Sequence, residues 1–230
     1  MDSITKLIDM TLRDEQEKRG LRERSGKYSP SMLGRCFRAQ VYNRKNIEQS
    51  NPPDSRTLRV FKAGHLFHQF AQQFLPEHQV EVPIDTDLFH GFADIVTIDC
   101  VWDIKSQHSQ AFWYMEKNDY DIAKERYGII LQVTLYASVL KLPTAKLLFI
   151  SKDDLTTAEY SFIVSEWQPH IDAECGKLKD FWDRGVIPAP VPRAYGVNKK
   201  SGDSNECMKY CPWRDYCFSQ QGIKLPERKV

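Results

Sequence analysis

The stretch FHGFADIVTIDCVWDIKS, residues 89–106, decides the fold of this chain. Two runs rich in β-branched and aromatic residues flank the pair Ile98-Asp99, which predicts a β-hairpin closed by a two-residue loop. The predicted cross-strand pairs are 97 with 100, 96 with 101, 95 with 102, and 94 with 103. Asp94 is then directly opposite Asp103, and Lys105 shares their face because side chains two residues apart on a strand point the same way. Like charges directly opposite each other are unfavourable, so this hairpin indicates a bound cation.

The predicted hairpin offers the ligands that a divalent metal ion requires. Two carboxylates and a histidine can hold Mg²⁺ or Mn²⁺ and leave coordination positions for water and a phosphate group. The histidine would come from a helix predicted over residues 56–75, where His65 and His68 lie on nearly the same face. The backbone carbonyl of Ile104 could also reach the metal, and Lys105 could orient or deprotonate an attacking water. The alternative is a surface hairpin with scattered acids, since Asp-x-Lys is a very common sequence.

Three further polar residues are candidates for the same site. Glu81 lies in a predicted short strand, residues 80–82, and is either a metal ligand or an exposed residue of an alternating strand. Gln132 and Tyr136 are four residues apart in a helix predicted over residues 120–141, so they share a helix face. They could hydrogen-bond a substrate phosphate or the lysine, or could simply border the core.

Four of the six cysteines form a split set. Cys207, Cys211 and Cys217 fall within eleven residues and can provide three thiolates to a metal or iron–sulfur centre. Cys36, in the sequence LGRCFR, is the natural fourth ligand, and its participation would join the two ends of the chain. Four thiolates suit a structural zinc ion as well as an iron–sulfur cluster. The two isolated cysteines are expected to be structural: Cys100 and Cys175.

Charge is nearly balanced overall but uneven along the chain. The 230 residues are 41% hydrophobic and 27% charged, with a net charge of +1, which is typical of a globular protein. Residues 1–62 carry 14 Lys and Arg against 8 Asp and Glu, and residues 193–230 carry 8 against 4. Residues 63–104 carry 7 acids and no Lys or Arg. Basic ends suit a phosphate backbone and an acidic middle suits a divalent cation, although solvated helix faces would give the same counts.

The first residues do not predict an export signal. The sequence MDSITK lacks the basic and then apolar pattern of a signal peptide, and no apolar run is long enough to cross a membrane. We therefore expect an intracellular, cytoplasmic protein with no membrane association. In that reducing compartment, grouped cysteines bind metal more often than they form disulfides.

The order of predicted elements is typical of a mixed α/β fold. Helices are expected over residues 3–24, 30–42, 56–75, 120–141 and 165–184, and strands over residues 80–82, 89–97, 100–106, 146–151 and 160–164. Three prolines mark an extended linker before the cysteine group: Pro188, Pro190 and Pro192. We expect one domain over residues 1–230, with a core at 63–185 and an appendage formed by 1–62 and 186–230.

Together these motifs resemble those of the RecB-family nucleases that carry an iron–sulfur cluster, a group that includes the AddB nuclease domain and the CRISPR-associated adaptation nuclease. The resemblance spans residues 28–217. The matching motifs are Tyr28-Ser29-Pro30-Ser31-Met32-Leu33 with Cys36 and Arg38, Gly64-x-x-x-His68, Gly91-x-x-Asp94, Asp103-Ile104-Lys105, Gln132-x-x-x-Tyr136-Ala137, and Pro188 with Cys207, Cys211-Pro212-x-Arg214 and Cys217. The resemblance implies a PD-(D/E)XK, lambda-exonuclease-like α/β core, in which a mixed sheet is flanked by helices. It also implies a helical iron–sulfur appendage that joins both termini.

The activity that the resemblance implies is Mg²⁺- or Mn²⁺-dependent cleavage of DNA. The implied metal ligands are His68, preferred over His65, Asp94, Asp103 and the carbonyl of Ile104, and the implied catalytic residues are Lys105, Asp103 and Asp94. A 4Fe-4S cluster would be held by Cys36, Cys207, Cys211 and Cys217, with zinc as the alternative. Recombination, repair or CRISPR adaptation, each with its protein partners, is the implied setting. The rival functions are a non-catalytic module that binds DNA ends and a zinc-stabilised scaffold.

Single-stranded DNA or a DNA end is the expected substrate. Basic residues lie among the terminal cysteines, and the candidates for contact with DNA are Arg35, Arg38 and Arg214, with Glu81, Gln132 and Tyr136 as accessory residues. Aromatic residues interleave with them: Phe37, Tyr42, Tyr210, Trp213 and Tyr216. Aromatic faces stack on unpaired bases while cations follow the backbone. The alternative is that Trp213 and Tyr216 pack around the cysteine cluster.

Overall fold

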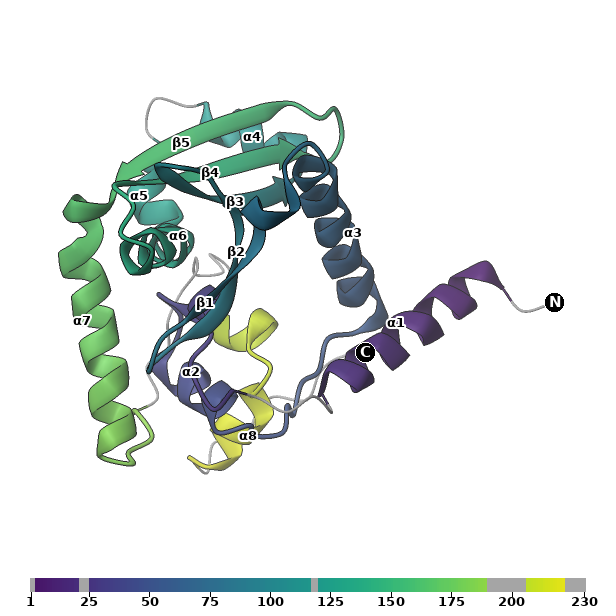
Figure 1. The fold of residues 1–230 in the computed structure, drawn as a ribbon. Helices are drawn as coiled ribbons and strands as arrows, with labels where there is room; N and C mark the ends of the chain where they lie inside the picture. The colour runs from purple at the N-terminus through teal and green to yellow at the C-terminus, as the bar shows by residue number, and fades with distance from the viewer. Residues whose placement is uncertain (1–2, 21–24, 117–119, 190–205, 222–230) are drawn as a thin grey trace.

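A five-stranded mixed sheet forms the centre of the chain. The computed structural model describes residues 3–20, 25–116, 120–189 and 206–221. The strands follow the chain order across the sheet: β1 (Val80–Asp85), β2 (His90–Val96), β3 (Cys100–Gln107), β4 (Thr144–Ser151) and β5 (Thr157–Ile163). Neighbours are antiparallel except β3 and β4, which are parallel, so the chain crosses over between them through helices. The expected α/β class, with a mixed sheet and flanking helices, is confirmed (Figure 1).

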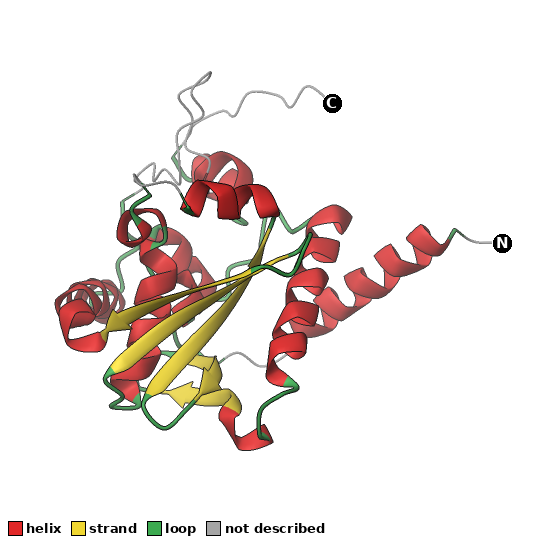
Figure 2. Cartoon of the chain, turned by 90° about the horizontal axis from the view of Figure 1, so that it is seen from above, coloured by secondary structure: helices red, strands yellow, loops and turns green. Residues whose placement is uncertain are grey.

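Helices cover both faces of this sheet (Figure 2). On one face, α6 (Tyr127–Val139) buries an unbroken apolar-rich run, residues 130–137, against Ala93, Val101 and Phe149. A helix that is apolar all round must be buried on all sides, and α7 (Val164–Asp183) packs on its outer surface. On the other face, α3 (Ser55–Gln72) packs Phe67 and Ala71 against a second core cluster that contains Ile95, Ile104 and Ile150.

The hairpin between β2 and β3 has the predicted register. Ile95 pairs with Trp102 and Val96 with Val101, and the N–H of Thr97 donates to the carbonyl of Cys100 over 2.9 Å. The regular pairing does not continue beyond Ile95 and Trp102 to the predicted pair of Asp94 with Asp103. The carboxylate of Asp94 instead accepts a hydrogen bond of 2.7 Å from the backbone N–H of Ile104, so it reaches the main chain of the neighbouring strand.

The helix predicted over residues 30–42 is two helices with a sharp break. A short helix η1 (Pro30–Met32) is followed by α2 (Phe37–Arg44). Gly34 lies between them at φ = +72°, in a conformation that disfavours other residues. A Cβ at Gly34 would lie 2.7 Å from the Cα of Gly128, at the start of α6. The break therefore depends on a contact between segments that are distant in sequence, which local pattern does not reveal.

The remaining elements differ less from the prediction. The region 120–141 divides at Arg126 into α5 (Ile122–Glu125) and α6, and α4 (Ser109–Met115) was not predicted. Gly185, at φ = +64°, ends α7 as expected. The first helix, α1 (Ile4–Gly20), is attached to α3 by the ion pairs Asp9–Arg59 and Glu15–Lys62, and its N-terminal half projects from the body (Figures 1 and 2).

Two segments that are far apart in the sequence, α2 and the region of α8 (Arg214–Ser219), lie together. α8 lies beside α2, and Trp213 is fully buried against Ala39 and Tyr42 (Figure 1). Pro190 and Pro192 of the expected linker lie outside the described residues, and the division into core and appendage stays a prediction. Within the described residues, no helix is both long enough and apolar enough to span a membrane.

Candidate metal centre

Three side chains from different elements converge beside the sheet. His68 comes from α3, Glu81 from β1 and Asp94 from β2, and their potential ligand atoms all lie within 4.8 Å of one another. Ligands bound to one Mg²⁺ ion at about 2.1 Å can be at most about 4.2 Å apart, so this spacing is close to that of a single coordination shell. One imidazole and two carboxylates form a donor set that suits Mg²⁺ or Mn²⁺.

Asp94 is the best-anchored member of this group. Its Oδ2 accepts the N–H of Ile104 and lies 3.5 Å from Nδ1 of His68. Burial alone would raise the pKa of Asp94, but the hydrogen bond with His68 and the charge of Lys105 outweigh it and the pKa is lowered. Burial has the opposite effect on His68 and lowers its pKa, but the hydrogen bond to Asp94 outweighs burial and the pKa of His68 is raised overall. The Asp94 carboxylate is therefore ionised and held in place, as a metal ligand must be.

Asp103 and Lys105 form an ion pair in β3 in which the carboxylate is buried and the lysine is half-buried. Asp103 is 1% exposed, and its Oδ2 lies 2.5 Å from Nζ of Lys105. Neither oxygen of Asp103 accepts a well-directed hydrogen bond from the described residues. Burial raises the pKa of Asp103 to about 6, although Lys105 opposes the shift. Besides its ion pair with Lys105, the buried carboxylate therefore keeps an oxygen that a metal ion can bind.

The same attraction keeps Lys105 charged. Burial lowers the pKa of Lys105, but the carboxylates of Asp103 and Asp94 raise it by more than burial lowers it. The pKa of Lys105 is therefore above its ordinary value. Lys105 therefore carries a proton at neutral pH and can donate hydrogen bonds. Asp103 does not fall within the compact group of His68, Glu81 and Asp94, and its direct ligation, like that of the Ile104 carbonyl, stays a prediction.

Glu81 is held in an unusual backbone conformation. Its φ of +48° is rare for a residue other than glycine, and such positions concentrate at functional sites. Gln72, one helical turn beyond His68, donates to Glu81 Oε1 over 2.8 Å and to the carbonyl of Asp94 over 3.0 Å. Gln72 was not predicted as a site residue. Its spacing of four residues from His68 is the signal that could have identified it.

Tyr136 lies at the border of the group, as the helix spacing allowed. It is 3% exposed, and burial raises its pKa although Gln132 hydrogen-bonds to it and opposes the shift. The hydroxyl of Tyr136 approaches Gly91, where a Cβ would lie 2.8 Å from that oxygen and 3.1 Å from the ring of Pro30. Gly91 is therefore required for this close approach. By contrast, a Cβ at Gly64 would meet nothing within 4 Å.

The four cysteines of the split set are brought to one place. Burial raises the pKa of the Cys211 thiol to about 12, and electrostatic interaction with the thiols of Cys36, Cys207 and Cys217 adds to the shift. One zinc ion with bonds of about 2.3 Å would hold its sulfurs about 3.8 Å apart. No three of these sulfur atoms, all within the described chain, lie within 4.8 Å of one another. Their arrangement is thus wider than a formed zinc site.

Two of the five aromatic residues expected to stack on bases are buried inside the protein. Trp213 and Tyr42 are each 1% exposed, and Trp213 donates its indole N–H to the carbonyl of Ile47 over 2.8 Å. Phe37 packs on Phe181. Stacking by Trp213 and Tyr42 is therefore wrong, and the alternative of packing around the cysteines describes Trp213. Tyr210, by contrast, is 65% exposed.

The three arginines named as DNA contacts lie in different surroundings. Arg38 donates to the hydroxyl of Tyr42 over 2.5 Å and to the carbonyl of Pro188 over 3.3 Å. Arg214 donates to Asp215 over 2.7 Å. Arg35 is exposed, and its charge acts on Lys105. Of the three, Arg35 is the one placed near the acidic group.

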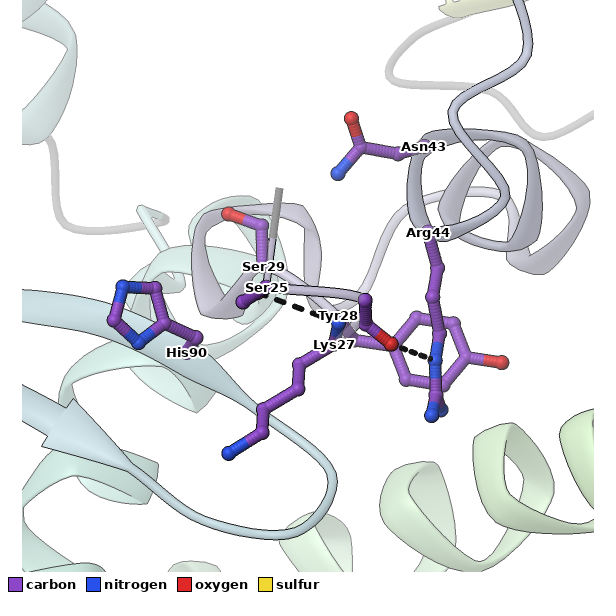
Figure 3. A pocket seen from close by; sticks show the side chains of 8 residues that line it. Ser25, Lys27, Tyr28, Ser29, Asn43, Arg44 and His90 are labelled. Carbon is purple, nitrogen blue, oxygen red and sulfur yellow. Dashed lines mark hydrogen bonds between the residues drawn. The ribbon is translucent and has the colours of Figure 1, made fainter. Parts of the chain in front are cut away.

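A separate surface hollow of about 610 Å³ lies beyond the start of β2 (Figure 3). It is lined by Ser25, Gly26, Lys27, Tyr28, Ser29, Asn43, Arg44 and His90. Lys27 donates to Asp85 over 2.9 Å, and Arg44 donates to the carbonyl of Gly26 over 2.7 Å while stacking on Trp182. Internal partners thus already engage its cations, and the hollow is distinct from the group of His68, Glu81 and Asp94.

Comparison with known proteins finds similarity to solved structures only. No protein-family model matches the chain, and no curated protein matches it. The crystal structure of SSO0001 is similar, with a TM-score of 0.55 and 18% identity over 94% of this chain and 96% of that one. An alkaline exonuclease (LHK-Exo) from Laribacter hongkongensis aligns with a TM-score of 0.43 and 14% identity, over 74% of this chain and 100% of that one. Its complex with dAMP aligns at 0.41 and 13%, over 70% and 95%. The similarity to SSO0001 shows a shared fold.

Proposed function

We propose that this chain is a Mg²⁺- or Mn²⁺-dependent deoxyribonuclease with a PD-(D/E)XK core. The convergence of His68, Glu81 and Asp94 within 4.8 Å, beside the ion pair of buried Asp103 with Lys105, carries the proposal. Structural ion pairs rarely leave a buried carboxylate with so few donors, whereas a site that binds a cation must do so. Asp103 and the carbonyl of Ile104 are proposed as further ligands.

The residues divide the work of phosphodiester hydrolysis. When bound, a divalent ion neutralises charge on the phosphate and lowers the pKa of a coordinated water. Asp94 orients the ligand set, because its carboxylate is tied to the backbone of β3. Lys105, which is protonated and held by Asp103, donates hydrogen bonds to the attacking water or to the charge that develops on the phosphate. Tyr136 and Gln132 support this edge of the site.

The cysteine set is proposed to hold a 4Fe-4S cluster that joins both termini. An iron–sulfur cluster distributes its thiolates over several iron atoms and therefore spaces them more widely than one zinc ion does. The interaction of the Cys211 thiol with those of Cys36, Cys207 and Cys217 supports a shared centre, and the resemblance of the motifs favours iron–sulfur over zinc. The backbone N–H groups near Cys36, which oppose the effect of burial on its pKa, would also favour a bound thiolate.

Single-stranded DNA or a DNA end is proposed as the substrate, with exonuclease action in recombination, repair or CRISPR adaptation. The exposed cation Arg35 beside the acidic group supports a nucleic acid ligand. The burial of Trp213 and Tyr42 removes part of the stacking argument, so strand preference depends chiefly on access to the metal group and on charge.

Parallel measurements of metal binding and digestion test the proposal. Purified protein is titrated with Mn²⁺ by calorimetry and then incubated with end-labelled single-stranded, overhanging and blunt DNA at fixed salt. We expect Mn²⁺ to bind and the single strand to be lost first. Asp94→Asn should weaken Mn²⁺ binding and abolish cleavage, because it replaces a ligand charge with a neutral amide.

The matched control is Asp99→Asn, which removes an exposed acid at the tip of the same hairpin. It should leave both Mn²⁺ binding and cleavage unchanged. Mn²⁺ binding without cleavage of any DNA would favour a non-catalytic DNA-binding module. Equal metal binding by wild type and Asp94→Asn would refute the proposed site.

A further inference from the structure

Three consecutive backbone positions are held by buried polar side chains. The N–H of Gly34 donates to Glu174 Oε1 over 2.9 Å, and the N–H of Cys36 donates to Glu206 Oε1 over 3.0 Å. Between them, the carbonyl of Arg35 accepts from Gln40 Nε2 over 3.1 Å. These three holders come from α7, from helix η3 (Glu206–Tyr210) and from α2. We call them the Arg35 clamp.

The clamp buries three polar side chains to hold one short loop. Glu174 is 6% exposed, Glu206 7% and Gln40 1%. Burying carboxylates and amides is unfavourable unless they are hydrogen-bonded, and here the bonds go to the loop and to each other, since Gln40 also donates to Glu174 over 3.2 Å. Three such groups are more than a turn of this length needs, because its other amide, that of Arg35, is satisfied by Met32.

The loop is immobilised on its other side as well. Gly34 lies at φ = +72°, and a Cβ there would collide with the Cα of Gly128 at 2.7 Å. Just before the loop, Pro30 packs near Gly91 and the hydroxyl of Tyr136. The clamped loop therefore runs past the border of the metal group and cannot shift toward or away from it without breaking several contacts.

The side chain presented by this rigid loop is a cation. Arg35 is exposed, whereas the residues that hold its backbone are buried. Its positive charge is near enough to Lys105 to oppose the rise in the pKa of that lysine. A guanidinium on such a loop can bind a phosphate oxygen at a lower cost in backbone conformational entropy than one on a mobile loop, because its backbone is already ordered.

We infer that Glu174, with Gln40 and Glu206, positions Arg35 to bind one backbone phosphate of a single-stranded nucleic acid beside the metal group. Glu174 is thus a positioning residue that acts through Arg35 and does not itself touch the substrate. The inference rests on the proposed function, since it assigns a phosphate-binding group to that site.

Salt-dependent binding without cleavage tests the inference. Fluorescence anisotropy of a labelled single-stranded oligonucleotide is measured in EDTA at several salt concentrations. Loss of one phosphate contact lowers the slope of log K against log salt by about 0.7 for a single strand. We expect this change for Arg35→Ala, the same change for Glu174→Ala, and no further change in the double variant.

Conservative variants separate positioning from general stability. Glu174→Gln keeps an acceptor for Gly34 and should bind with the wild-type slope. If Glu174→Ala does not fold, Gln40→Met removes the donor to Arg35 while keeping a similar volume, and it should lower the slope in the same way. Arg184→Ala removes an exposed cation at the end of α7 and should leave the slope unchanged.

The outcomes distinguish this inference from the proposed function. If the wild type binds and cleaves DNA but Arg35→Ala keeps the full slope, only the inference is overturned. It is also overturned if Arg35→Ala lowers the slope and neither Glu174→Ala nor Gln40→Met does. A wild-type protein that binds no nucleic acid would overturn both.

Discussion

Replacing Asp103 by asparagine should stabilise the metal-free protein at neutral pH. Burial raises the pKa of Asp103 from 3.8 to about 6, so ionising this side chain is harder in the folded state than in the unfolded state. The difference is about 2 pKa units, which at about 1.4 kcal/mol per unit corresponds to a cost of about 3 kcal/mol at pH 7 and above. An asparagine side chain cannot ionise, so the Asp103→Asn variant should avoid that cost.

The pH dependence gives this prediction its sign. Below pH 3.8 the carboxyl group is protonated in both states and the cost is absent; it develops between pH 3.8 and about 6 and is complete above pH 6. The attraction of Lys105 is already included, because it opposes the rise in the Asp103 pKa. The gain in stability of Asp103→Asn should therefore grow from near zero at pH 4 to about 3 kcal/mol at pH 7.5.

Urea unfolding in EDTA at pH 4, 5.5 and 7.5 measures this gain, with Asp99→Asn as the control at an exposed acid. Adding Mn²⁺ at pH 7.5 should then stabilise the wild type more than Asp103→Asn, because a bound cation offsets the charge of Asp103 only where that charge exists. The reasoning would be refuted if Asp103→Asn is no more stable than the wild type at pH 7.5. It would also be refuted if the gain in stability at pH 4 equals the gain at pH 7.5, because the charge of Asp103 would then not be what destabilises the metal-free protein.

Three further changes have defined outcomes. Lys105→Ala should keep DNA binding within about twofold but slow cleavage by roughly 10²–10⁴-fold in the digestion assay, because the lysine acts on the water and on transition-state charge; rapid cleavage by a clean preparation would contradict that role. Cys36→Ala should lose bound iron and expose both termini to limited proteolysis, whereas Cys100→Ala, at an isolated cysteine, should keep full iron; retained iron in Cys36→Ala would mean that the fourth ligand is wrong. Gly91→Ala should lower the free energy of unfolding by about 1–3 kcal/mol, because its Cβ would lie 2.8 Å from the Tyr136 hydroxyl, whereas Gly176→Ala, with nothing within 4 Å, should be neutral or stabilising in the same urea titration.

Local pattern was sufficient for the hairpin that carries the acids. The register of β2 and β3 follows from strand periodicity and a two-residue loop, both properties of neighbouring residues, and the observed pairs Ile95–Trp102 and Val96–Val101 agree with it. The helix that carries His68 was predicted for the same reason. The predicted pair of Asp94 with Asp103 is not among the observed pairs, and the carboxylate of Asp94 instead bonds to the main chain of β3 where the regular pairing ends.

The composition of the acidic group depended on packing. Glu81 joins His68 and Asp94 because β1 pairs with β2 and α3 lies against the same part of the sheet, so residues far apart in sequence meet. Gln72 owes its two hydrogen bonds to the same arrangement. The hypothesis of stacking aromatics failed at Trp213 and Tyr42 because sequence shows that aromatics are present but not which ones a core encloses.

The sequence by itself determined the α/β class, the hairpin register, the helix bearing His68 and the grouping of chemically active residues into acids and cysteines. These features depend on interactions within a few residues, where propensity and periodicity act directly. Only the tertiary structure decided that Gly34 breaks a helix against Gly128, that Asp103 is buried with Lys105, and that Glu174 and Glu206 hold the loop of Arg35. Each of these contacts joins segments whose separation is set by the packing of whole helices on the sheet, and short stretches of sequence do not encode that packing.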